Sequence, residues 1–143
     1  IIVGENGLGQ RYKEVKSYLD SNKIDYEIHG FVSKDKLSEF FKNCHISVIP
    51  LVSGLLPNKF FDSIANYCPI LVIGRHGGAS TEVEENDLGW VVDFDYNQIY
   101  DVLSKINIES INQKILNIKT NFNKYLETTS LKNMYNAIKN NEV

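Results

Sequence analysis

The feature that most constrains the fold is a helix-forming segment enclosed by two apolar runs. Residues 46–50 and 69–74 are the apolar runs, and Leu-Pro-Asn-Lys-Phe-Phe-Asp-Ser-Ile-Ala lies between them at 56–65. This order predicts a strand, a loop, a helix and a second strand. Pro57 falls near the first helical position, where its missing N–H costs nothing. Two strands joined by a helix favour a parallel pair with a right-handed crossover.

The same alternation extends along most of the chain. Short apolar runs predict strands at 1–4, 26–32, 46–50, 70–74 and 89–92. Helical periodicity separates them and continues alone from residue 94 to residue 143. Because the strands are continuously apolar, we expect a sheet that is covered on both faces. The sequence therefore predicts one α/β domain over 1–143 with a Rossmann-like, mostly parallel sheet, followed by C-terminal helices over 94–143.

Composition excludes several classes of protein. A chain of 143 residues fits one domain, and its net charge of −3 comes from interspersed acidic and basic residues. We expect no nucleic-acid partner, because the sequence has no basic stripe. No apolar run approaches the roughly 18 residues of a membrane span. Cys44 and Cys68 are too few for a disulfide framework or a zinc site, and as small buried hydrophobes they suit the reducing cytosol.

The start of the chain suggests a fragment. It has no initiator Met and opens directly on the predicted strand at 1–4. We therefore expect any targeting signal to lie outside it. The glycines of the following loop, Gly4, Gly7 and Gly9, are spaced G-x-x-G-x-G. Because a dinucleotide site needs G-x-G-x-x-G, the loop is better explained as a turn into the next helix.

Asp62 and Lys59 lie three residues apart on the predicted helix and allow two interpretations. They could form a surface ion pair, which would contribute only a few tenths of a kcal/mol. Alternatively, the Asp62 carboxylate could accept two hydrogen bonds from a vicinal diol, since it is acceptor-only with two oxygens. The free N–H groups around residues 57–59 would then face a diphosphate, as helix N-termini often do.

The three histidines differ in their surroundings. His29 and His45 lie in or beside predicted strands and are expected to be structural. His76 follows a strand, between Arg75 and the pair Gly77-Gly78. A cation and a histidine beside open backbone N–H groups could hold an anion. An exposed polar loop is the equally good alternative.

Taken together, these segments resemble the C-terminal, sugar-nucleotide-binding domain of GT-B glycosyltransferases, specifically glycosyltransferase family 4. The resemblance rests on the order and spacing of several segments. Residues 2–7 look like the second strand and turn of that domain, and residues 29–33 look like its "L-G-x-V" strand end. Residues 44–50 look like its "A-D-V-x-V-x-P" strand, and residues 56–70 look like its donor-site helix and "G-x-P-V" strand. Residues 77–82 look like its Gly-Gly loop with a Glu-bearing helix, and residues 89–92 look like its "G-x-L-V" strand.

The chain departs from the family pattern at two places. The family often has two glutamates separated by seven residues; Gly54 stands at the first, which helps hold the transferred sugar, and Asp62 at the second, which contacts ribose. The Lys59-x-x-Asp62 pattern is similar to that of a bacterial subgroup that builds surface polysaccharides. The first strand of the domain, its Arg/Lys loop and the acceptor-binding N-terminal domain are expected to precede Ile1.

The resemblance implies the donor half of a retaining glycosyltransferase, which moves a sugar from a nucleoside diphosphate sugar to a hydroxyl acceptor without a cofactor or a catalytic metal. Asp62 would bind the ribose. Lys59 and the backbone at 54–57 would approach the diphosphate or the sugar. The backbone at 4–7 and 30–32 would border the base and the ribose. No catalytic residue is assigned. The full list of expected binding positions is Gly4, Gly7, Phe31, Val32, Gly54, Leu55, Pro57, Asn58, Lys59, Asp62 and His76.

The resemblance also implies a setting and leaves alternatives. We expect a cytoplasmic enzyme of surface-polysaccharide or glycan synthesis, which could work at the inner face of the membrane, with a sugar or lipid-linked acceptor bound by the missing domain. The fragment alone should transfer no sugar. A GT-B sugar-nucleotide epimerase is one alternative, although only His76 and Asp62 could serve its chemistry here. A nucleotide-sugar-binding module that has lost catalysis is the other, consistent with Gly54.

Overall fold

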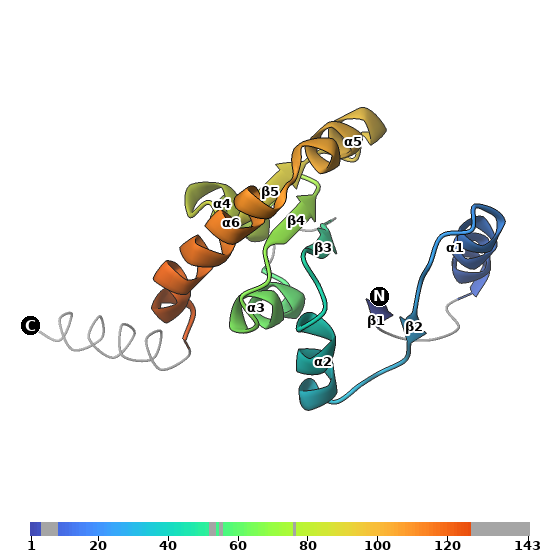
Figure 1. Cartoon of the computed structure of the whole chain (residues 1–143), viewed down its shortest axis with the longest axis horizontal. Helices are drawn as coiled ribbons and strands as arrows, with labels where there is room; N and C mark the ends of the chain where they lie inside the picture. Colours follow the sequence, from blue (N-terminus) through green and yellow to red (C-terminus); the bar gives the residue numbers. More distant parts are fainter. Residues whose placement is uncertain (4–8, 52–53, 55, 76, 127–143) are drawn as a thin grey trace, which may run out of the picture. The chain divides into compact units, whose positions relative to one another are not determined.

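The computed structural model describes residues 1–3, 9–51, 54, 56–75 and 77–126. The chain divides into two compact units, Ile1–Cys44 and His45–Val143 (Figure 1). Both units contain parallel strand pairs and helices.

The first unit pairs two short strands. Strand β1 (Ile2–Val3) lies parallel to β2 (Ile28–His29), with Ile2 opposite Ile28. Helix α1 (Gly9–Ser21) connects them, and α2 (Lys34–Phe41) follows. Ser33, a residue type that is favoured at helix N-caps, caps α2: its hydroxyl accepts a hydrogen bond from the N–H of Lys36 at 3.3 Å. Strand β2 is shorter than the predicted run at 26–32.

The second unit contains a three-stranded parallel sheet in the order β3-β4-β5. The strands are β3 (Ser47–Pro50), β4 (Ile70–Ile73) and β5 (Gly89–Val92). Helix α3 (Asn58–Ala65) connects β3 to β4, and α4 (Gly78–Glu85) connects β4 to β5. The strand–helix–strand order predicted from the sequence is confirmed here, with Ser47 opposite Ile70 and Ile70 opposite Gly89.

Helices dominate the rest of the described chain. Helix α5 (Tyr96–Lys105) is capped by Asp95, and α6 (Ile108–Asn121) begins with a capping box between Asn107 and Ser110. The 3₁₀ helix η1 (Phe122–Tyr125) follows α6 directly. Residues 127–143, the last part of the predicted C-terminal helical region, lie outside the described residues. No helix among those described is long and apolar enough to cross a membrane.

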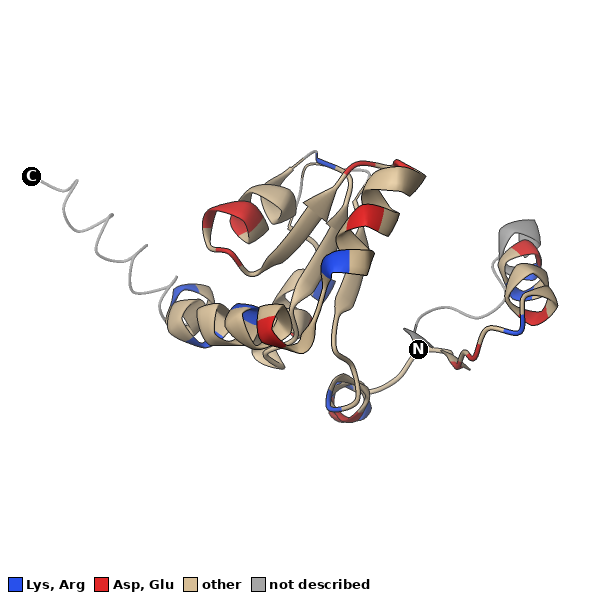
Figure 2. Ribbon diagram, turned by 45° about the horizontal axis from the view of Figure 1, so that its top comes forward, with Lys and Arg blue, Asp and Glu red and all other residues tan. Residues whose placement is uncertain are grey.

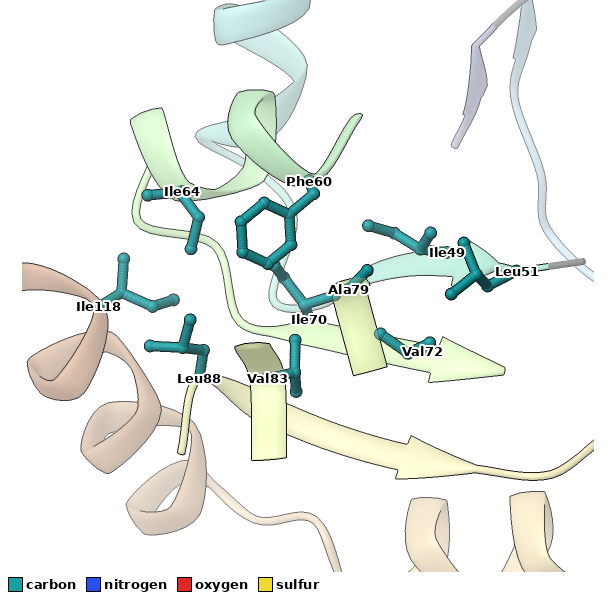
Figure 3. Close-up of a cluster of buried hydrophobic side chains, with 10 residues drawn as sticks. All are labelled: Ile49, Leu51, Phe60, Ile64, Ile70, Val72, Ala79, Val83, Leu88 and Ile118. Carbon is teal, nitrogen blue, oxygen red and sulfur yellow. The ribbon is translucent and has the colours of Figure 1, made fainter. Parts of the chain in front are cut away.

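The core of the second unit lies between the sheet and its helices (Figure 3). Along β4 the successive residues Ile70, Leu71 and Val72 are all buried. Because neighbouring residues of a strand point to opposite faces, the sheet is covered on both faces at β4, as predicted. The cluster on one side consists of Ile49, Leu51, Phe60, Ile64, Ile70, Val72, Ala79, Val83, Leu88 and Ile118.

The structure defines the starts of two helices more closely than the sequence did. Pro57 is the N-cap of α3, with extended backbone (φ −76°, ψ 153°), so the first helical residue is Asn58. Helix α4 begins at Gly78, inside the segment 77–82 that resembled a Gly-Gly loop followed by a helix. Small residues allow this start, because Ala79 and Ser80 are buried at this turn.

Candidate functional site

The candidate site lies where the loops after β3 and β4 meet, at the carboxyl edge of the sheet. The N–H of Gly78 donates a hydrogen bond to the carbonyl of Gly54 at 3.2 Å. Gly77 has φ +120° and ψ −178°, and a Cβ added there would lie 2.5 Å from the Gly54 Cα. The two loops are therefore in direct backbone contact. In open α/β sheets this edge is where ligands bind.

Helix α3 begins at Asn58, shortly after this contact, and its first N–H groups are available to a ligand. No described side chain caps its N-terminus, and Asn58 and Lys59 are both exposed. The first N–H groups of a helix lack intrahelical partners, and the macrodipole adds a partial positive charge there. The start of α3 can therefore attract an anion, to which the Lys59 ammonium would add a full charge.

Asp62 lies on the side of α3 away from the core. The buried residues of this helix are Phe60, Ser63 and Ile64. At about 100° per residue, Asp62 shares the opposite side with Asn58, one turn earlier. Ser63 anchors the buried side, since its hydroxyl donates to the Lys59 carbonyl at 2.7 Å and lies 2.8 Å from the Ser47 hydroxyl.

The Asp62 carboxylate has no hydrogen bond or ion pair with any described residue, although the side chain is half-buried. Lys59 and Asp62 therefore do not form the surface ion pair that their spacing allowed. The described interaction of Asp62 is through its backbone carbonyl, which accepts from the Asn66 side-chain amide at 2.8 Å. A half-buried acceptor of this kind is available to a ligand hydroxyl.

Arg75, at the start of the loop after β4, is already engaged. Its guanidinium contacts Glu84 at 2.7 Å and Asp93 at 3.4 Å. Two carboxylates offset its charge, so Arg75 is poorly placed to hold an anion together with His76. His76 itself lies outside the described residues.

The remaining predicted positions fall into two groups. Phe31 and Val32 follow β2 in the first unit, where Phe31 is 83% exposed and Val32 is half-buried. Gly4, Gly7 and Leu55 lie outside the described residues.

Within the described ranges, no group of three or more His, Cys, Asp and Glu side chains is arranged to hold a metal ion.

Comparison with known proteins identifies the family. A sequence model of the family described as glycosyl transferases group 1 matches residues 1–106. The chain belongs to this family. No curated protein and no solved structure matches it. The match supports the resemblance to a GT-B glycosyltransferase domain and a general role in glycosyl transfer.

One polar centre of this glycosyltransferase domain was not predicted. Glu82, on α4, uses the single oxygen Oε2 to accept from Lys124 at 2.8 Å, Tyr125 at 2.7 Å and Asn86 at 3.1 Å. Burial raises the pKa of this carboxyl, but the hydrogen bonds from Lys124, Tyr125 and Asn86 together with the Lys124 charge outweigh it. The net effect is a pKa below the ordinary value. Burial, followed by the bond to Glu82, raises the pKa of Tyr125.

This centre links helices of complementary charge. Helix α4 carries glutamates and no cation, whereas α6 and η1 carry lysines (Figure 2). At the far end of α4, Lys114 of α6 pairs with Asp87, and the Asn117 amide donates to the same carboxylate at 2.7 Å. Glu82 is therefore a structural anchor for η1, and the only hint of it in the sequence was its resemblance to the Glu that follows the family's Gly-Gly loop.

Proposed function

We propose that this glycosyltransferase domain binds the nucleoside diphosphate part of a sugar nucleotide at the start of α3. The observation that carries the proposal is that α3 joins an N-terminus that no described side chain caps with a half-buried carboxylate that has no hydrogen-bond or ion-pair partner among the described residues. The N-terminus suits the diphosphate, and the Asp62 carboxylate suits the ribose diol. Lys59, Asn58, Pro57 and Gly54 would border the diphosphate and the sugar.

The complete enzyme would transfer the sugar to a hydroxyl acceptor with retention of configuration, in surface-polysaccharide or glycan synthesis. This follows the resemblance to glycosyltransferase family 4 stated above. The domain needs no catalytic metal or cofactor in this proposal. The acceptor would be a sugar or a lipid-linked sugar bound by a second domain, and the enzyme would work in the cytoplasm, at the inner face of the membrane where the acceptor is lipid-linked.

Calorimetric titration tests the binding step. UDP, GDP and ADP are each titrated into the chain, with the matching nucleosides as controls. We expect one diphosphate to bind at least tenfold more tightly than its nucleoside, since about 1.4 kcal/mol gives each factor of ten. Equal affinity for diphosphate and nucleoside would contradict a phosphate site at α3.

Product analysis of the complete protein tests the reaction. Formation of a glycoside supports the proposal. An epimerised sugar nucleotide would indicate the epimerase alternative, and tight binding without turnover would indicate a module that has lost catalysis. Gly54, at the position of the family's sugar-holding Glu, is the residue that favours the last of these outcomes.

A further inference from the structure

The inference concerns Tyr125, in the 3₁₀ helix η1, outside the residues 1–106 that match the family. Its hydroxyl donates to Glu82 Oε2 on α4 at 2.7 Å. Its ring meets the ring of Phe60 on α3 edge to face, with centroids 5.5 Å apart. One side chain therefore contacts both crossover helices of the three-stranded sheet.

Both residues that Tyr125 contacts are held in place by other interactions. Phe60 is fully buried and immediately follows Lys59 on α3. Glu82 is held by Asn86 of its own helix and by Lys124 in addition to Tyr125. A second ring contact reinforces the attachment of η1 to the far end of α3, since Phe122 lies 5.3 Å from Tyr67 between centroids. Movement of η1 would therefore be transmitted to α3 and α4 together.

A backbone contact connects the start of α4 to the loop before α3. Gly78 of α4 donates to the Gly54 carbonyl in the loop that leads into α3. That backbone contact consists of one hydrogen bond of 3.2 Å and the packing of Gly77 on Gly54, with no side-chain cap on either helix start among the described residues. The separation of the two N-termini therefore depends on what holds the bodies of the helices as well as on this loop contact.

We propose that Tyr125 is a positioning residue for the donor site: through Phe60 and Glu82 it fixes α3 and α4 relative to each other, and so places the start of α3 for the diphosphate. The inference rests on the proposed function. It gives η1, which lies beyond the residues that match the family, a role in positioning the donor site in addition to its packing against the core. The phenolic hydroxyl is the informative group, because its removal leaves the ring contact with Phe60 in place.

The test compares Tyr125→Phe with Lys114→Met in the full chain. Lys114→Met removes the ion pair with Asp87 at the far end of α4, keeps the Asn117 hydrogen bonds to Asp87, and leaves both contacts of Tyr125 intact. Amide hydrogen exchange is measured at residues 58–60 and 77–80 in the free protein. UDP, GDP, ADP and their nucleosides are titrated into each variant.

For Tyr125→Phe we expect faster exchange at both helix starts. We also expect affinity for the diphosphate to fall roughly two- to thirtyfold, as for substitutions that act on a site through packed side chains. Nucleoside affinity should change less, so selectivity for the diphosphate falls. Lys114→Met should leave exchange at these residues and the selectivity unchanged. A general loss of stability would lower both affinities together.

A second substitution tests whether Tyr125 acts through its hydrogen bond to Glu82. In a Glu82→Leu background, Tyr125→Phe should have no further effect on exchange or selectivity, whereas Glu82→Gln keeps an acceptor and should retain part of the wild-type selectivity. If wild type binds a diphosphate and Tyr125→Phe leaves its selectivity unchanged, the inference is wrong and the proposed function stands. If wild type binds no diphosphate, the proposed function is wrong, and the inference falls with it.

Discussion

Gly77 packs directly on the backbone of Gly54, and the relationship is asymmetric. A Cβ on Gly77 would lie 2.5 Å from the Gly54 Cα and 2.8 Å from its carbonyl carbon, whereas a Cβ on Gly54 would meet no atom of the described residues within 4 Å. The loop after β4 therefore requires glycine at its contact with the loop after β3. The loop after β3 has room for a side chain at the same contact.

The first prediction concerns Gly77→Ala. Its backbone, at φ +120° and ψ −178°, lies in a region that is essentially restricted to glycine. Strain of about 1–3 kcal/mol adds to the clash with Gly54, so the free energy of unfolding should fall by at least that amount. Urea denaturation followed by circular dichroism measures it. An unchanged midpoint would show that the two loops are not held together as described.

The second prediction concerns Gly54→Glu, the reverse case. A Cβ at this position meets no described atom within 4 Å, so the free energy of unfolding should change by no more than about 0.5 kcal/mol. It also places a carboxylate at the position where the family holds the transferred sugar. We expect affinity for a sugar nucleotide to rise relative to the bare diphosphate, measured by calorimetry, with Gly54→Ala as the control without a carboxylate. A large loss of stability would contradict the open surroundings of Gly54.

The strands of the sheet and the order of the crossovers were predictable because they depend on local patterns. Apolar runs fixed β3, β4 and β5 to within a residue or two, and Ser33 identified the start of α2. The start of α4 at Gly78 was harder to predict, because Gly78 and Ser80 have weak helix preferences when taken alone. Burial of Ala79 and Ser80 against the core outweighs those preferences.

The polar centre at Glu82 was beyond sequence reasoning for a different reason. Glu82 and Tyr125 are 43 residues apart, and nothing local indicates that they meet. Likewise, the 3-residue spacing of Lys59 and Asp62 allowed an ion pair that the side chains do not form. Local spacing limits which contacts are possible, whereas packing of the whole unit decides which of them are made.

The third prediction is an acid dependence of stability through Glu82. Its pKa in the folded state lies below the ordinary value of 4.5, so between these two values the unfolded chain binds more protons than the folded one. The stabilisation by this carboxylate is complete above about pH 5 and is lost as the pH falls through the folded pKa. The difference in unfolding free energy between wild type and Glu82→Gln should therefore be constant near neutrality and shrink in acid. Urea titrations at a series of pH values measure it, and a difference that grows in acid would contradict the lowered pKa.

The fourth prediction concerns Lys59→Ala. Lys59 is exposed in the first turn of α3 and has no ion pair with a described residue, so its removal should leave the fold intact. A charge-assisted hydrogen bond to phosphate is worth roughly 1.5–3 kcal/mol, so diphosphate affinity should fall by about tenfold or more. Nucleoside affinity should stay the same. Equal losses for both ligands in calorimetry would place Lys59 away from the phosphates.

The fifth prediction concerns Asp62→Asn. The substitution keeps the shape of the side chain but replaces one acceptor oxygen with a donor amide, so two ribose hydroxyls cannot both be bound as before. Each hydrogen bond to a charged group contributes roughly 1.5–3 kcal/mol, so nucleotide affinity should fall about tenfold or more. Stability should change little, because the carboxylate has no partner among the described residues to lose.

A 2′,3′-dideoxy nucleoside diphosphate is the control for this substitution. It lacks both hydroxyls, so it should bind the wild-type chain poorly and be almost insensitive to Asp62→Asn. The ratio of ribose to dideoxy affinity thus isolates the contribution of the diol from any general effect of charge near the start of α3. If Asp62→Asn weakened both ligands by the same factor, Asp62 would act through stability or through the overall field of the site. The ribose would then have to be bound elsewhere in the domain.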